Sequence, residues 1–169
     1  MMNWEAIGAI GEVLGAAGVI GTLAYLAFQI RQNSESVRLN AGQTILTSLH
    51  EALLSAAATP QQARVVILGQ TDFDSLPDDE KIQFLVWIFS WFRVLETAHL
   101  YQKRGILDSE IWTGHVVHLR QVMKSSAIQS WWEIRKIFFS ESFQAFVDEA
   151  ALAESSVLNP REMVESIRT

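Results

Sequence analysis

The stretch that decides the fold is Ile7–Ile30, IGAIGEVLGAAGVIGTLAYLAFQI, in which only Glu12, Thr22 and Gln29 interrupt a run of apolar residues and glycines. At a rise of 1.5 Å per residue such a helix is about 36 Å long, and it crosses a hydrocarbon core of roughly 30 Å with some tilt. A cleaved secretory signal is disfavoured because the leader MMNWE carries an acid and no Lys or Arg. The sequence therefore predicts a transmembrane anchor over residues 1–32.

The alternative is a buried central helix of a soluble protein. Glu12 favours this alternative because a carboxylate within a lipid-facing helix is costly. Five glycines favour the membrane, since each destabilises a helix in water by about 1 kcal/mol and glycine is commoner in membrane helices. Arg31 and Arg38 follow the segment and place that side in the cytoplasm, with the N-terminus outside. Trp4 and Tyr25 lie near opposite ends of the segment, where amphipathic rings favour the headgroup level.

The small residues of this segment share one helical face. Four glycines alternate steps of three and four residues, and a threonine continues the series. Such residues let a partner backbone approach closely in lipid, where no hydrophobic drive brings helices together. Glu12 lies beside this face and either hydrogen-bonds across the contact or stays at headgroup depth. We therefore predict a helix–helix interface at the glycine face, Gly8, Gly11, Gly15, Gly18 and Thr22, together with Glu12.

The rest of the chain predicts an all-α fold, a bundle of about five to six helices. Apolar residues recur at helical spacing, and Pro, Gly, Ser and Asp mark the helix ends. The longest of these helices is apolar on nearly all sides, so its own domain or a partner subunit must cover it. The predicted helices are 34–58, 61–68 (stopping at Gly69), 77–104, 108–124, 126–138 and 140–154. These define a soluble domain at 33–154 and a frayed tail at 155–169.

Composition fits one anchored domain and excludes several classes of site. After residue 30 the chain has 13 Lys and Arg against 17 Asp and Glu, and no basic stripe indicates nucleic acid. There is no cysteine, which excludes disulfides, Cys-ligated zinc, iron–sulfur clusters and thiol nucleophiles. No nucleophile elbow or phosphate-binding loop frames the Ser, His and Asp residues. We expect neither a catalytic site nor a cofactor.

Three groups of residues carry a resemblance. They are YLAFQIRQN at 25–33, GILD at 105–108 followed by Trp112, and WWEIR at 131–135 followed by Phe138 and by FQAFVD at 143–148. In this order they resemble a family of uncharacterised bacterial membrane proteins, over nearly the whole chain. The resemblance implies a small, membrane-anchored helical protein of the bacterial inner membrane, and it brings no activity with it.

Two pairs of polar residues have the spacing of metal ligands. Glu96-x-x-His99 matches one half of a di-iron motif, and His115-x-x-His118 puts two imidazoles on one helical face. A ferritin-like site needs a second Glu-x-x-His pair and two further glutamates, which the sequence lacks. We therefore expect these four to be ordinary helix residues. The tryptophans at 87, 112, 131 and 132 line a ligand pocket or, more simply, pack in the core.

These features favour a non-enzymatic, single-pass membrane protein that acts by helix–helix association. Its partners are membrane lipid and either further copies of itself or other membrane subunits, and its soluble domain lies in the cytoplasm. The alternative function is a membrane sensor that binds a small ligand or a metal near Glu96, His99, His115 and His118.

Overall fold

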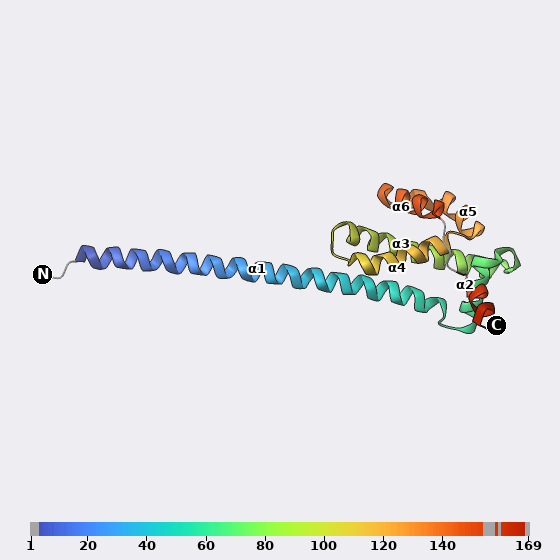
Figure 1. Ribbon diagram of the computed structural model, residues 1–169, viewed down its shortest axis with the longest axis horizontal. Coiled ribbons are helices and arrows are strands. Elements are labelled where there is room, and N and C mark those ends of the chain that lie inside the picture. Colours follow the sequence, from blue (N-terminus) through green and yellow to red (C-terminus); the bar gives the residue numbers. More distant parts are fainter. Residues whose placement is uncertain (1–3, 154–157, 159, 168–169) are drawn as a thin grey trace. The chain divides into compact units, whose positions relative to one another are not determined.

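The computed structural model describes residues 4–153, 158 and 160–167, and of these it leaves undescribed the side chains of 4–7, 9, 10, 13, 160 and 161. The predicted interface position of the Trp4 side chain, and the leader before it, therefore lie outside the described residues. The described part is all-α, without a strand, and it contains seven α-helices, which confirms the predicted fold class. The elements (Figure 1) are α1 (Trp4–Ala56), α2 (Pro60–Thr71), η1 (Phe73–Ser75), α3 (Asp78–Lys103), α4 (Ser109–Val122), α5 (Ser126–Arg135), η2 (Lys136–Phe138), α6 (Glu141–Leu152) and α7 (Pro160–Ile167).

Helix α1 is one continuous helix of 53 residues, whereas the sequence predicted a break near residue 33. Ser34 or Ser36 would cap the second helix predicted over 34–58. Their hydroxyls instead donate to the carbonyl oxygens of Ile30 (2.8 Å) and Gln32 (3.1 Å), one turn back in the same helix. Serine tolerates the helix interior when its hydroxyl is bonded in this way. With no proline or glycine nearby, nothing interrupts the backbone.

The chain divides into two compact units, residues 1–41 and 42–169. In the first unit, every residue from Leu14 to Asn40 is exposed. Leu14–Ala56 is long and apolar enough to cross a membrane, by length and composition, and no part of its apolar window is buried. A helix whose apolar side chains stay exposed within its own unit is typical of a segment covered by lipid or by another helix.

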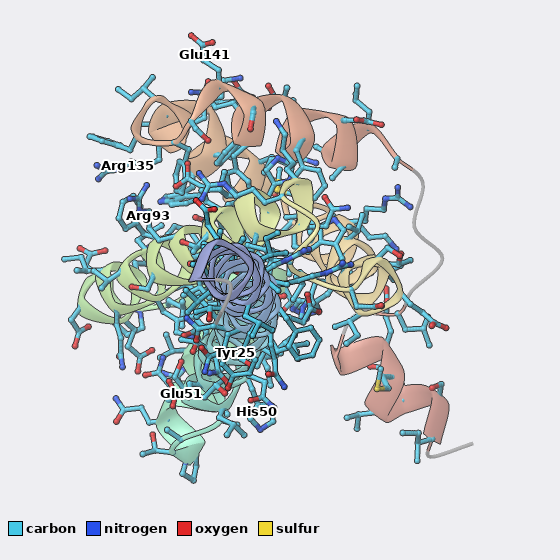
Figure 2. The ribbon with its side chains drawn as sticks, turned by 90° about the vertical axis from the view of Figure 1, so that its left-hand side faces the viewer. Tyr25, His50, Glu51, Arg93, Arg135 and Glu141 are labelled. Atoms are coloured by element: carbon cyan, nitrogen blue, oxygen red, sulfur yellow. The ribbon has the colours of Figure 1, made fainter. Side chains whose placement is uncertain are left out.

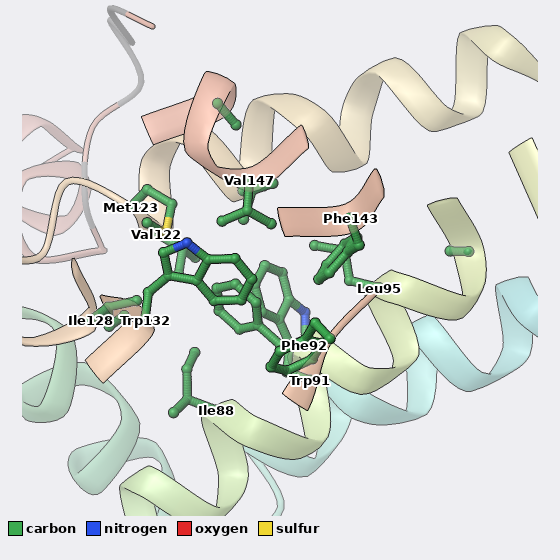
Figure 3. Close-up of a cluster of buried hydrophobic side chains, with 14 of the residues drawn as sticks. Ile88, Trp91, Phe92, Leu95, Val122, Met123, Ile128, Trp132, Phe143 and Val147 are labelled. Carbon is green, nitrogen blue, oxygen red and sulfur yellow. The ribbon is translucent and has the colours of Figure 1, made fainter. Parts of the chain in front are cut away.

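The second unit is a helical bundle around an aromatic core. The last part of α1 contributes Ile45 and Leu49 to this core, and α3 supplies its centre, as predicted for the long apolar helix. Figure 3 shows Trp132 of α5 beside Phe92 of α3 and Phe143 of α6, with ring centroids 5.2 and 6.1 Å away. Core packing, the simpler prediction for the tryptophans, is confirmed for Trp112 and Trp132, which are buried, and in part for Trp87, which is partly buried against the core. Trp131 is buried too, but it also lines a surface groove.

Capping residues set the helix ends close to where the sequence predicted them. Thr59 caps α2 by accepting the Gln62 N–H, and Asp108 caps α4 by accepting the N–H groups of residues 110 and 111. Gly105 ends α3 with a left-handed φ of 66°. The Ile106 N–H donates to the Tyr101 carbonyl oxygen at 3.0 Å, which closes the Schellman turn that glycine permits at low cost.

Two predictions about helix ends are wrong. Gly69 does not stop α2, which continues to Thr71, because the glycine is in the helix for packing: a Cβ there would overlap the ring of Phe84. The tail predicted to be frayed contains α7, an amphipathic helix that begins at a proline, a residue favoured in the first helical turn. A further feature could not be predicted from the sequence: Glu80 of α3 is buried. Its carboxylate oxygens accept hydrogen bonds from the Arg64 guanidinium of α2 at 2.6 and 2.8 Å.

Candidate functional site

The glycine face lies open on α1. At Gly8, Gly11, Gly15 and Gly18 an added Cβ would meet nothing within 4 Å. The Thr22 hydroxyl donates to the Gly18 carbonyl oxygen at 2.8 Å, so its polar hydrogen is already bonded within the helix. Glu12 is exposed beside this face. Within residues 1–41, no described residue covers the predicted interface residues.

Glu96 does not join the histidines. Its carboxylate oxygens bind Arg93 at 2.6 Å and accept the backbone N–H of Ser140 at 2.7 Å. These contacts connect α3 to the residue that precedes α6, which is a structural use of both oxygens. Within the described residues there is no group of three or more His, Cys, Asp or Glu side chains that could hold a metal ion.

His99 lies in an aromatic environment. The residue is 8% exposed, and its ring stacks on Phe146 with centroids 4.6 Å apart, with Trp112 and Phe143 close by. Nε2 lies 3.5 Å from the Ser142 hydroxyl, and Nδ1 is buried without a hydrogen-bond partner in the described chain. Burial, and then the positive charge of Lys103, lower the pKa of His99. The neutral imidazole of His99 is therefore packed among aromatic rings, in surroundings that would also suit a phenyl ring.

The other two histidines lie on α4. Burial lowers the pKa of His115. Much of His118 is exposed, yet its ring stands edge-on to Trp91 with centroids 5.5 Å apart, and desolvation followed by the charge of His115 lowers its pKa as well. All three folded-state pKa values thus lie below the ordinary value of 6.5.

We expect His99→Phe to raise the free energy of unfolding by about 1 kcal/mol at pH 7, because it removes a buried unpaired nitrogen. Below the ordinary histidine pKa the unfolded chain binds more protons than the folded one, so the stability of the wild type falls as the pH falls. The stability of His99→Phe should therefore depend less on pH than that of the wild type. His115 and His118, whose pKa values are also lowered, should account for the pH dependence that remains. Thermal unfolding at pH 5 to 7.5 tests the prediction, with the exposed His50→Gln as the control. An unchanged pH dependence in His99→Phe would contradict it.

The residues of the resemblance have a structural use in the bundle. The Trp132 indole N–H donates to Asp148 at 2.7 Å, which joins the WWEIR segment of α5 to the FQAFVD segment of α6. Lys136 lies between Glu133 (2.9 Å) and Asp148 (3.6 Å). Those motifs therefore specify helix packing in this chain.

A groove that the sequence did not reveal runs between α3, α5 and η2. Its first lobe, the apolar lobe, has a volume of about 530 Å³. Four of the side chains along the two lobes, Ile82, Val86, Ile134 and Phe138, are each more than half exposed. Covering these four would contribute on the order of 4–8 kcal/mol before the cost of association. The apolar lobe is lined by Ile82, Leu85, Val86, Phe89, Ser90, Trp131, Arg135 and Phe138.

A second lobe, the polar lobe, continues the groove toward η1. It has a volume of about 630 Å³ and shares Leu85, Trp131 and Arg135 with the apolar lobe. Its other walls carry two carboxylates and three serine hydroxyls, Asp72, Asp74, Ser125, Ser126 and Ser130. Each lobe by itself is within the size range of small-ligand sites in proteins.

Arg135 stands where the two lobes meet. Its guanidinium lies 5.7 Å from the centre of the Phe138 ring, and no carboxylate in the described chain forms an ion pair with it. Arg93 lies on the same side of the bundle (Figure 2) and donates to the Phe138 carbonyl oxygen at 3.3 Å, but Glu96 neutralises it. Arg135 is therefore the cation that this groove offers to a ligand.

The features on which a function can rest are thus the uncovered glycine face of α1 and the two-lobed groove of the bundle. No protein-family model, curated protein or solved structure matches the chain.

Proposed function

We propose that this chain is a non-enzymatic, single-pass protein of the bacterial inner membrane that acts by helix–helix association. The observation that supports this proposal most is the open glycine face within the candidate span Leu14–Ala56, together with the few residues before it. In lipid, small residues in register allow close backbone contact, and van der Waals packing then holds the helices together.

The partner is a second copy of this chain or another membrane subunit. Arg31 and Arg38 after the apolar segment favour a cytoplasmic bundle and an N-terminus on the outer side. Both arginines are exposed on α1.

Leucines at Gly11 and Gly15 are expected to weaken this association at least tenfold, which is about 1.4 kcal/mol, because two bulky side chains separate the packed backbones. The measurement is the native mass of the full-length protein in a mild detergent, by light scattering, with any subunits that co-purify identified. The matched control is Ala17→Leu with Ala24→Leu, which adds the same side chains on the opposite side of α1.

A wild type that loses its oligomeric mass or its co-purifying subunits only in the glycine variant supports the proposal. If the glycine variant and the control keep the same mass and the same subunits as the wild type, the glycine face is not the contact. A wild type that is monomeric and purifies alone would overturn the proposed association.

A second candidate function is favoured by the groove, namely binding of a small ligand by the bundle. The sequence placed such a site near Glu96 and the histidines. Both carboxylate oxygens of Glu96 are hydrogen-bonded, to Arg93 and to the Ser140 N–H. The groove, by contrast, is open and is lined by Arg135, which has no carboxylate partner in the described chain.

A further inference from the structure

The two lobes of the groove differ in chemistry although they share three residues. The apolar lobe has Ser90 and Arg135 as its polar lining residues, and hydrocarbon side chains make up the rest. The polar lobe presents both signs of charge, with Asp72 and Asp74 on η1 and the residue before it, and Arg135 at the end of α5. A ligand that fills both lobes must therefore be an amphiphile whose head carries an anion and a cation.

We propose that the groove binds a zwitterionic phospholipid with an amine headgroup, such as phosphatidylethanolamine. The phosphate lies at Arg135, the ammonium group lies toward Asp72 and Asp74, and one acyl chain lies along Ile82, Val86 and Phe138. Choosing a membrane lipid rests on the anchoring part of the proposed function, because the candidate span brings the bundle to a bilayer.

The polar lobe offers donors and acceptors for such a head. Guanidinium and phosphate form charge-assisted hydrogen bonds, and a planar guanidinium binds two phosphate oxygens at once. Ser125, which precedes α5, makes no capping hydrogen bond with its side chain, and the lobe is also lined by Ser126 and Ser130, so hydroxyl groups are available beside the cation. An anionic head without an amine would leave the two aspartates facing a negative charge, which favours the zwitterion.

The arrangement fits a lipid better than a partner helix. An amphipathic helix in a groove needs apolar pockets repeated at i, i+4 and i+7 along the whole contact. Here the apolar lobe has few polar groups, whereas both carboxylates and three serine hydroxyls lie in the polar lobe, beside apolar residues such as Phe73 and Ile134. Charged groups confined to one end of the groove match a lipid whose headgroup lies at that end and whose acyl chain lies in the apolar lobe.

The experiment measures binding of a short-chain phosphatidylethanolamine to full-length protein in a sugar-headed detergent, by native mass spectrometry. We expect Arg135→Gln and Val86→Asn each to weaken binding at least tenfold. The matched controls are Arg104→Gln and Ile111→Asn, exposed residues outside the groove, which should bind like the wild type. Phosphatidylglycerol of the same chain length should bind at least fivefold more weakly, and free phosphoethanolamine should not bind measurably.

A second readout locates the lipid. Trp131 lines both lobes, so a phosphatidylethanolamine with a brominated acyl chain should quench its fluorescence, and Trp131→Phe should remove that part of the quenching. Equal binding by the groove variants and the controls would overturn the proposal. Loss of a co-purifying protein from the groove variants, with lipid binding unchanged, would also overturn it and assign the groove to a protein partner.

The Gly11→Leu/Gly15→Leu variant separates this inference from the proposed function. It should bind the lipid like the wild type even where its oligomeric mass is lost, because the groove lies wholly within residues 70–138. Normal association without lipid binding defeats the lipid site alone.

Discussion

Trp132→Ala is expected to lower the free energy of unfolding by about 3–5 kcal/mol, a large part of the stability of a domain of this size. Trp132 is 1% exposed, and its ring packs against Phe92, Phe139 and Phe143. Its removal leaves a cavity among rings that cannot close over it, and it leaves the Asp148 carboxylate without its indole donor. Urea unfolding of the full-length protein in detergent, followed by near-ultraviolet circular dichroism, measures the loss.

Trp132→Phe is the matched control for the cavity. It keeps most of the buried ring and removes the indole N–H, so the expected loss is nearer 1–2 kcal/mol. Asp148→Asn should cost less than Trp132→Phe, because the asparagine amide oxygen still accepts the indole N–H, whereas Trp132→Phe removes the donor and part of the buried ring. The double variant should cost little more than Trp132→Phe alone. An alanine variant no less stable than the phenylalanine variant would show that Trp132 does not fill the core as described.

Gly69→Ala is expected to destabilise the bundle by about 1–3 kcal/mol, although alanine is intrinsically favoured over glycine in a helix by about 1 kcal/mol. The new methyl group would overlap the ring of Phe84. That ring is 1% exposed, and its neighbours are Phe73 at 5.9 Å and Trp87 at 6.2 Å between centroids, so it has little room to move. The steric cost therefore exceeds the gain in helix propensity.

Gly114→Ala in α4 is the control for Gly69→Ala. A Cβ there meets nothing within 4 Å, so the same substitution should stabilise by up to about 1 kcal/mol. Gly69→Ala combined with Phe84→Leu should cost less than the two single changes together, since the smaller side chain makes room for the methyl group. If both glycine substitutions stabilise the protein, the close contact between α2 and α3 is absent.

Local sequence signals were sufficient for most of the fold. The helical spacing of apolar residues, Thr59-Pro60, Gly105 and Asp108 act within one or two turns of where they stand, and the structure has helix ends at each of them. The helical break expected at Ser34 failed because a serine hydroxyl bonds its own helix as readily as it caps another. The prediction that Gly69 ends a helix failed because the role of this glycine depends on its packing against Phe84, 15 residues later in the sequence.

The groove could not be predicted for a related reason. Its walls come from η1, α3, α5 and η2, and no spacing along the sequence indicates that Val86 and Phe138 share a surface. Ile82, Val86 and Phe89 also look like core residues in the sequence, because a helix that is apolar on nearly all sides does not reveal which side stays open. The spacing of Glu96 and His99, by contrast, suggested that the two side chains bind a metal or a ligand together. The Glu96 carboxylate is instead bonded to Arg93 and to the Ser140 N–H.

The last part of α1 has a consequence for the order of synthesis. Gly42 approaches the carbonyl oxygen of Ile106 at 3.4 Å, and Ser55 accepts the indole N–H of Trp87 at 3.0 Å. Both partners leave the ribosome after α1, and at about 5–20 residues per second Ile106 follows Gly42 by roughly 3–13 s. During that interval residues 42–56 have a core-facing side, with Ile45 and Leu49, that the rest of the core cannot yet bury, so these side chains stay exposed until α3 is made.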